Sequence, residues 1–102
     1  MDDVEKVRRE SMRWNILNVL NKNRPHLMSE VFLLDIIRAI FPGATLVELR
    51  RELDYLEERN LVKLSKKPTG QWFAELSRYG IDIAEYTVEC HPGIARPEKY
   101  WG

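Results

Sequence analysis

The stretch TLVELRRELDYLEERNLVKLSKKPTGQWFAEL, residues 45–76, decides the fold, because it predicts one helix followed by two strands. Thr45 and Glu48 stand three residues apart, the capping-box spacing that marks the start of a helix. Asn60 stands where a helix closes, and asparagine is one of the few residues besides glycine that tolerates the left-handed conformation found there. Leucines recur along one face between these two signals, at Leu46, Leu49, Leu53 and Leu56.

The second half of this stretch predicts a β-hairpin. LVKLSK and QWFAEL are short and rich in β-branched, aromatic or alternating residues, and the Pro68-Thr69-Gly70 sequence between them supplies turn chemistry. Strand alternation divides the side chains between two faces. We expect an apolar face of Val62, Leu64, Trp72, Ala74 and Leu76, and a more exposed face of Lys63, Gln71, Phe73 and Glu75.

Two more helices are expected before this stretch and a short one after it. Residues 3–21 contain no proline or glycine and carry apolar residues at helical spacing. Ser29 is a candidate N-cap for a second helix, which Pro42 ends. A helix over residues 77–86 is weakened by Gly80. We therefore expect a domain over residues 1–86. An extended tail, residues 87–102, packs on the domain or on a partner.

Composition excludes several classes of protein. The chain has 102 residues, enough for one domain, and its 16 basic and 16 acidic residues give no net charge. Cys90 is the only cysteine, so the chain cannot form an internal disulfide and has no zinc-site spacing. We expect no cofactor, and we expect a reducing cytoplasm as the location. The start does not resemble a secretory signal. The longest apolar stretch, VFLLDIIRAIF, is too short to span a membrane.

Two segments resemble known DNA-binding regulators. LRRELDYLEERNLVKL, residues 49–64, resembles the helix–cap–strand junction of ArsR- and MarR-like regulators, with Asn60 where those families usually have glycine. AELSRYGIDIAE, residues 74–85, is similar to their return strand and the helix after it. The metal-sensing cysteine motif of ArsR-like sensors is absent, so metal-dependent release is not implied.

Over nearly its full length the chain also resembles small winged-helix proteins of Mu-like phages and prophages. The similarity includes RYG at residues 78–80 and PGIARPEKYW at residues 92–101. These resemblances imply an α+β, mainly helical, winged helix-turn-helix fold with three helices, a hairpin wing, a short C-terminal helix and an extended tail. They also imply a transcriptional regulator that binds double-stranded DNA, in which the third helix enters the major groove.

Lysines on the hairpin are the first candidate DNA contacts. Residues 60–74 hold three lysines and no acid, and Lys63, Lys66 and Lys67 are expected to contact phosphates. The alternative is that lysines on exposed edge strands only discourage aggregation between sheets.

The helix that opens at Thr45 carries the second set of candidates. Thr45 and Val47 lie in its first turn, followed by Arg50 and Arg51, whose guanidinium groups suit guanine edges and phosphates. The alternative is a solvated face, because residues 45–59 hold three arginines and five acids, and Asp54 stands at ion-pair spacing from both arginines.

Aromatic residues outside the main apolar stripes are candidate partner contacts. Trp14 lies off the stripe of the first helix, and Tyr100 and Trp101 end the tail. Such residues often anchor interfaces, so a homodimer, or a protein partner bound through the tail, is expected. For Trp14, packing under the tail is the alternative.

Catalysis finds little support, and we do not expect an enzyme. Cys90 and His91 are sequence neighbours, which turns their side chains to opposite sides of an extended chain. Two functions remain open. The first is a DNA-binding regulator, and the second is a protein-interaction or assembly module on the same scaffold that binds no DNA. A continuous positive face joining the hairpin and the third helix would favour the first.

Overall fold

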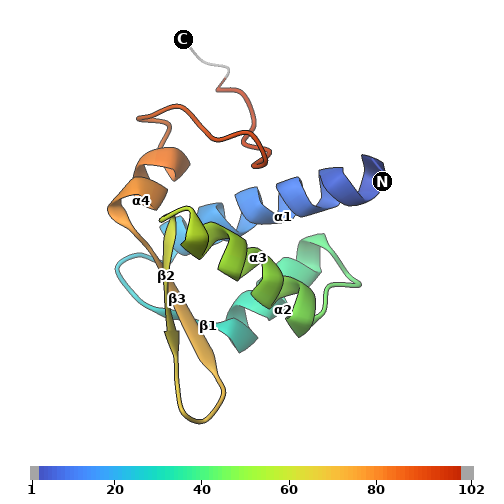
Figure 1. The fold of residues 1–102 in the computed structure, drawn as a ribbon, viewed down its shortest axis with the longest axis vertical. Coiled ribbons are helices and arrows are strands. Elements are labelled where there is room, and N and C mark those ends of the chain that lie inside the picture. Colours follow the sequence, from blue (N-terminus) through green and yellow to red (C-terminus); the bar gives the residue numbers. More distant parts are fainter. Residues whose placement is uncertain (1–2, 100–102) are drawn as a thin grey trace.

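A computed structural model describes residues 3–99 and folds them into four α-helices and a three-stranded antiparallel sheet (Figure 1). The α+β, mainly helical class expected from the sequence is confirmed. In chain order the elements are α1 (Asp3–Lys22), β1 (Met28–Ser29), α2 (Glu30–Ile40), α3 (Leu46–Glu58), β2 (Val62–Lys66), β3 (Trp72–Leu76) and α4 (Arg78–Ala84). The β2–β3 hairpin extends away from the helices, beyond the N-terminal half of α3.

Local capping signals set the helix boundaries as predicted. The side-chain oxygen of Ser29 accepts from the backbone N–H of Phe32 at 3.2 Å, and that of Thr45 accepts from the N–H of Glu48 at 3.1 Å. Asn60 adopts φ 62° after α3, the left-handed conformation predicted for it. The reciprocal half of the capping box is replaced, because the Glu48 carboxylate turns to the Arg8 guanidinium on α1.

The hairpin has the apolar face predicted from strand alternation. Val62 pairs with Leu76 and Leu64 with Ala74, so the expected apolar face points inward. β1, which the sequence analysis did not predict, pairs with β3 and makes β3 the central strand. Phe73 is half-buried rather than exposed, because it lies opposite Ser29 of β1.

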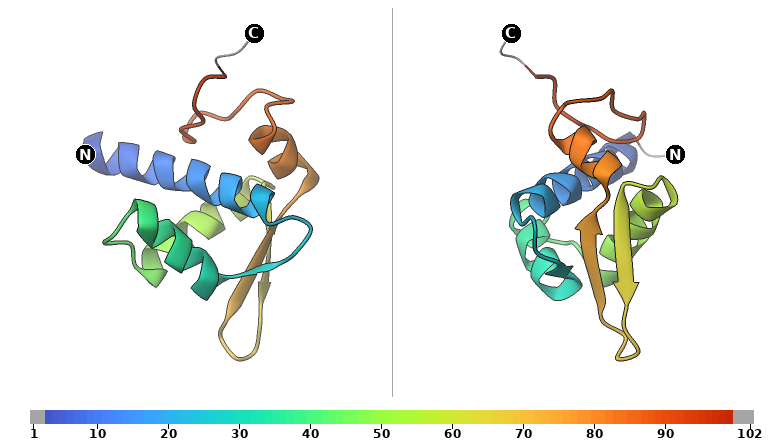
Figure 2. Two further views of the ribbon diagram at one scale, coloured as in Figure 1. Left: turned by 180° about the vertical axis from the view of Figure 1, so that it is seen from behind. Right: turned by 90° about the vertical axis from the view of Figure 1, so that its left-hand side faces the viewer.

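The tail packs back on the domain as far as Pro97. The buried side chain of Ile94 joins the hydrophobic core, and the N–H of Ala95 donates to the Glu10 carbonyl of α1 at 3.1 Å. Figures 1 and 2 show this segment lying over α1 and beside α4. Trp14 packs inside the chain, with its ring centroid 5.9 Å from that of Tyr86 and in edge-on contact. Tyr100 and Trp101 lie outside the described residues.

Within residues 3–99, none of the helices combines the length and the apolar character that crossing a bilayer requires.

Candidate nucleic-acid interface

Arg50 joins α3 to both α2 and the hairpin. Its Nε and Nη2 donate to the two carboxylate oxygens of Glu30, each at 2.6 Å, and Nη2 also donates to the Gly70 carbonyl at 2.6 Å. The same Glu30 carboxylate accepts from the backbone N–H of Trp72 at 3.0 Å. We call this set of four residues the Glu30 brace. It ties the hairpin to the pair of helices beside it.

Glu30 is the key residue of this network that sequence reasoning missed. An acid in the first turn of a helix normally lies at the surface, where its negative charge interacts favourably with the helix dipole. The position of Glu30 in the sequence therefore gave no sign of burial. Here only 3% of its surface is exposed. The two Arg50 hydrogen bonds, together with the Trp72 N–H, hold the pKa of the Glu30 carboxyl below its ordinary value despite burial, which alone would raise it.

Stability is expected to fall in acid because of this carboxyl. Its depressed folded pKa contributes stability that is fully present above the ordinary carboxyl pKa of about 4 and is lost as the pH falls through the lower folded value. Glu48, whose pKa is lowered mainly by hydrogen bonds from Arg8, acts in the same direction. Thermal unfolding followed by circular dichroism between pH 7 and about 2 should show this decline.

The stability of a Glu30→Gln variant should depend less steeply on pH over that window, because one of the titrating groups is gone. The matched variant Glu75→Gln changes an exposed acid on β3 and should keep the parent's slope. Identical slopes for Glu30→Gln and the parent would contradict the assignment.

The structure separates the two arginines that the sequence placed together. Arg50 points into the Glu30 brace, whereas Arg51 is exposed and makes no hydrogen bond or ion pair with any residue that the structure describes. Beside Arg51, Thr45 and Val47 are also exposed, and 68% of the Val47 surface is accessible. The outward group on the N-terminal half of α3 is therefore Thr45, Val47 and Arg51.

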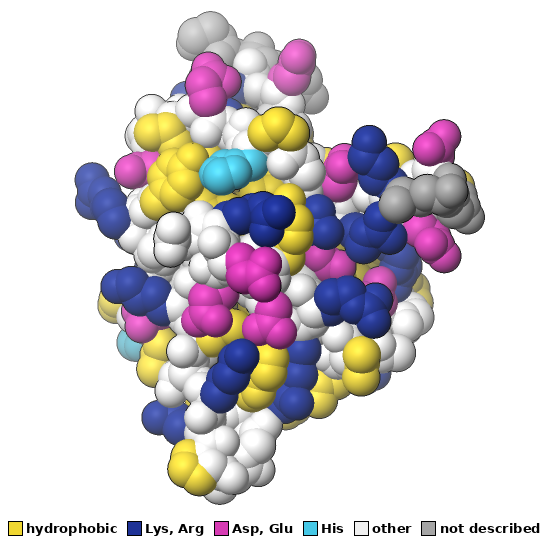
Figure 3. Space-filling model, viewed as in Figure 1, with side chains coloured by type: hydrophobic (Ala, Val, Ile, Leu, Met, Phe, Trp, Pro, Cys, Tyr) yellow, Lys and Arg dark blue, Asp and Glu magenta, His cyan; other side chains and the backbone are white. Residues whose placement is uncertain are grey.

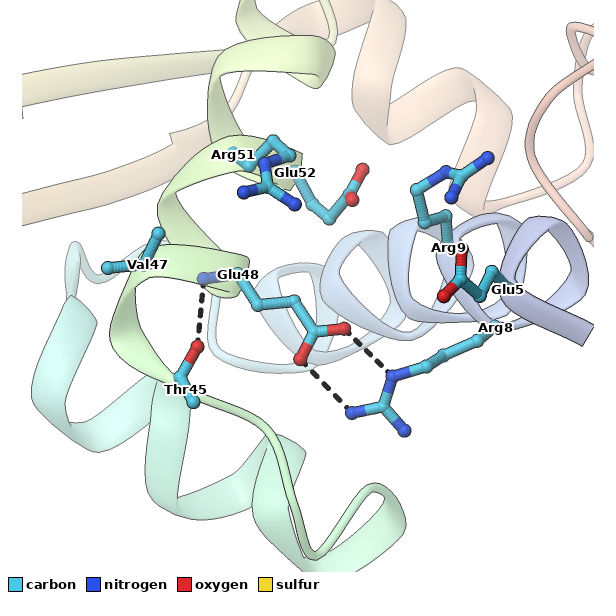
Figure 4. A pocket seen from close by; sticks show the side chains of 8 residues that line it. All are labelled: Glu5, Arg8, Arg9, Thr45, Val47, Glu48, Arg51 and Glu52. Carbon is cyan, nitrogen blue, oxygen red and sulfur yellow. Dashed lines mark hydrogen bonds and ion pairs between the residues drawn. The ribbon is translucent and has the colours of Figure 1, made fainter. Parts of the chain in front are cut away.

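These three residues border a pocket of about 340 Å³ between α1 and α3. Figure 4 shows its lining from both helices, with the Arg8 guanidinium bound to the Glu48 carboxylate at 2.8 and 3.0 Å. The full lining is Glu5, Arg8, Arg9, Thr45, Val47, Glu48, Arg51 and Glu52. Three acids face three arginines there, so the pocket carries no net charge.

The hairpin lysines differ in their surroundings. Lys66 Nζ lies 3.3 Å from the Asp54 carboxylate and 4.2 Å from the centre of the Trp72 ring. Asp54 thus pairs with β2, not with the arginines of its own helix. Lys63 and Lys67 are exposed and form no ion pair within residues 3–99.

Positive and negative groups share this face of the molecule. The Arg50 guanidinium lies 4.6 Å from the Trp72 ring centre, so Arg50 and Lys66 flank one indole and connect α3 to the hairpin. Both cations are paired with acids, however. Figure 3 shows acidic side chains gathered in the middle of this face, with lysines and arginines below and beside them. The face is therefore mixed in charge, with acids between the cations, and is not a uniformly positive surface.

The described residues offer no assembled metal site or nucleophile–base pair. No group of three or more His, Cys, Asp or Glu side chains there could hold a metal ion. Burial raises the pKa of the Cys90 thiol, which disfavours the reactive thiolate. The neighbouring His91 instead bonds through Nε2 to the Tyr79 hydroxyl at 2.8 Å.

No family model, curated protein or solved structure matches this chain. The residues and their geometry alone therefore support a function.

Proposed function

We propose that this chain is a winged helix-turn-helix protein that binds double-stranded DNA and acts as a transcriptional regulator. In this proposal α3 enters the major groove and the β2–β3 hairpin is the wing. The order of elements supports it, since three helices are followed directly by a hairpin that packs beside the third.

The observation that carries the proposal is the Glu30 brace. By joining α2, α3 and the hairpin turn, it holds the hairpin lysines at a set position relative to the outward group of α3. Ordering flexible parts during binding costs free energy and weakens affinity, and a preformed surface of this kind avoids that cost. In this arrangement Arg50 positions the wing and does not itself read bases.

The proposed roles follow from side-chain chemistry. Arg51 can donate two parallel hydrogen bonds to a guanine edge or grip a phosphate, and Val47 offers an apolar contact for a thymine methyl group. The Thr45 hydroxyl oxygen accepts from the Glu48 N–H and so caps the N-terminus of α3. In this proposal that N-terminus lies against the DNA backbone, where backbone N–H groups favour phosphate. Lys63, Lys66 and Lys67 neutralise phosphates without regard to sequence.

Two variants with opposite expected effects on DNA affinity test the role of the wing. Lys66→Ala/Lys67→Ala should weaken binding to a labelled duplex of mixed sequence by about tenfold or more at 0.1 M salt, and should reduce the slope of log affinity against log salt by about two. Asp54→Asn should instead tighten binding by about threefold, because it releases Lys66 from its ion pair. Fluorescence anisotropy at several salt concentrations measures both effects.

Two outcomes would count against this assignment. An unchanged salt slope in the double variant would remove the wing from the interface, and absence of binding to any duplex at about 0.05 M salt would remove DNA as the partner. Selection of bound fragments from sheared genomic DNA then tests sequence preference, which Arg51→Ala should reduce.

A protein-docking module is the second candidate. It is favoured by the acidic side chains of Asp54, Glu57 and Glu58, which lie in the C-terminal half of α3 and would repel a phosphate surface. Parent protein that ignores duplexes at low salt would favour this candidate over DNA binding.

A further inference from the structure

α2 carries a large apolar surface on the side turned away from the core. Leu33, Leu34 and Ile37 are buried, whereas Phe32 is 54% exposed and Ile40 is 47% exposed. We call the exposed and half-exposed residues of this helix the α2 outer face: Val31, Phe32, Asp35, Ile36, Arg38, Ala39 and Ile40. Three large apolar side chains exposed on one short helix are more than scattered surface residues would give.

This face continues into a shallow apolar groove against α1. The groove has a volume of about 360 Å³ and is lined by Val19, Lys22, Asn23, Met28, Phe32 and Ile36. α2 lies behind α3 in Figure 1 and in front of it when the molecule is seen from behind in Figure 2. A partner seated on the α2 outer face would therefore leave the front of α3 and the hairpin uncovered.

The charges on this face complement themselves. Asp35 is exposed and has no hydrogen bond or ion pair with a described residue, and Arg38 donates its Nε to the Ala44 carbonyl at 2.8 Å but pairs with no described acid. The two residues are three positions apart on the same flank of α2. When two copies of a helix pack antiparallel about a two-fold axis, a residue of one faces a fixed residue of the other, and the same contact occurs twice.

We propose that the α2 outer face is the contact between two copies of this chain. The two-fold axis passes between Ile36 and Ile37, which places Asp35 beside Arg38 of the partner subunit, and Arg38 beside Asp35 of the partner subunit. Because one face holds the acid, the base and the exposed apolar side chains of Val31 and Phe32, a second copy fits it.

This contact replaces the dimer anchor expected from the sequence. Trp14 is partly buried and packs edge-on against Tyr86 of its own chain. The contact does not depend on DNA, since the residues that carry it lie on α2 and not on α3 or the hairpin.

Sedimentation equilibrium of the full chain without DNA, from about 1 to 500 µM, tests the proposal. The parent should dimerise in this range, and Phe32→Glu should raise the dissociation constant by about thirtyfold or more, the loss typical of a central interface residue. Val47→Glu is the matched control: it makes the same kind of change at an exposed apolar residue of α3 and should leave the dimer intact. A monomeric parent, or equal dissociation constants for the parent and Phe32→Glu, would overturn the proposal.

Charge exchange tests the register. Asp35→Arg and Arg38→Asp should each weaken the homodimer by about tenfold or more, because like charges then face each other twice. An equimolar mixture of the two variants should dimerise again, since both contacts become attractive, and the double variant Asp35→Arg/Arg38→Asp should dimerise by itself.

Circular dichroism melts establish that each variant folds, which matters most for Arg38→Asp because it loses the bond to the Ala44 carbonyl. Folded single variants that stay monomeric when mixed would refute the register. Since no DNA is present, this result is independent of the DNA-binding proposal.

Discussion

Gly80→Ala is expected to lower the free energy of unfolding by about 3 kcal/mol or to prevent folding. Gly80 is buried in α4, where a methyl group would overlap the carbonyl oxygen of Leu61, lie 3.0 Å from its carbonyl carbon and lie 3.1 Å from the Leu76 side chain. That carbonyl oxygen also accepts from the N–H of Ser77 at 3.0 Å, so the backbone there is held in place. The clash is with backbone and cannot be relieved by a rotamer change.

The sign of this effect is informative, because helix propensity alone predicts the opposite. Alanine in place of a helical glycine normally stabilises by about 1 kcal/mol. Urea denaturation of Gly80→Ala and Gly43→Ala decides between the two, since a methyl group at Gly43 meets nothing within 4 Å. Gly43→Ala should remain close to the parent. Equal midpoints for the two variants would show that α4 does not pack this tightly against Leu61.

Arg13→Met should lower the free energy of unfolding by about 3–5 kcal/mol, the loss typical of removing one partner from a buried ion pair. The Glu52 carboxylate is only 1% exposed, and its Oε1 accepts from Arg13 Nε at 2.7 Å. Its other oxygen has no hydrogen-bond partner among the described residues. Arg13 also stacks on the Tyr55 ring at 3.5 Å and donates to the Gly93 carbonyl of the tail at 2.9 Å. Its removal therefore leaves an unpaired buried charge and loosens the tail.

Two variants separate these contributions in chemical denaturation. Arg59→Met removes the other guanidinium stacked on Tyr55, also at 3.5 Å, but that arginine pairs only weakly with exposed Glu58 and should cost less than about 1 kcal/mol. Arg13→Met/Glu52→Leu should recover much of the lost stability, because no charge then remains buried. Equal losses for Arg13→Met and Arg59→Met would contradict the buried-pair account.

The features predicted correctly from the sequence are those that depend on near neighbours. The Ser29 and Thr45 caps, the left-handed Asn60 and the inward face of the hairpin all follow from residues within a few positions of one another. β1 was missed for the converse reason. It has only two residues and exists as a strand because Met28 and Ser29 pair with β3, far along the chain.

The candidate site was only partly predictable. The hairpin lysines and the outward residues Thr45, Val47 and Arg51 are on the surface, as their pattern indicated. The inward turn of Arg50 was not predictable, because nothing local distinguishes it from Arg51. Its partner Glu30 is on another helix, and the pairing forms only when α2, α3 and the hairpin come together.

By itself, the sequence determined the four helices, the two strands of the hairpin and the mainly helical class, because caps, periodicity and turn residues act over one or two helical turns. The tertiary structure alone decided that Glu30 and Glu52 are buried, that Gly80 is required, and that the tail lies on its own domain. These features depend on contacts between distant segments. Such contacts set burial and hydrogen-bond partners, and those in turn determine whether a charged or small residue stabilises the fold or disrupts it.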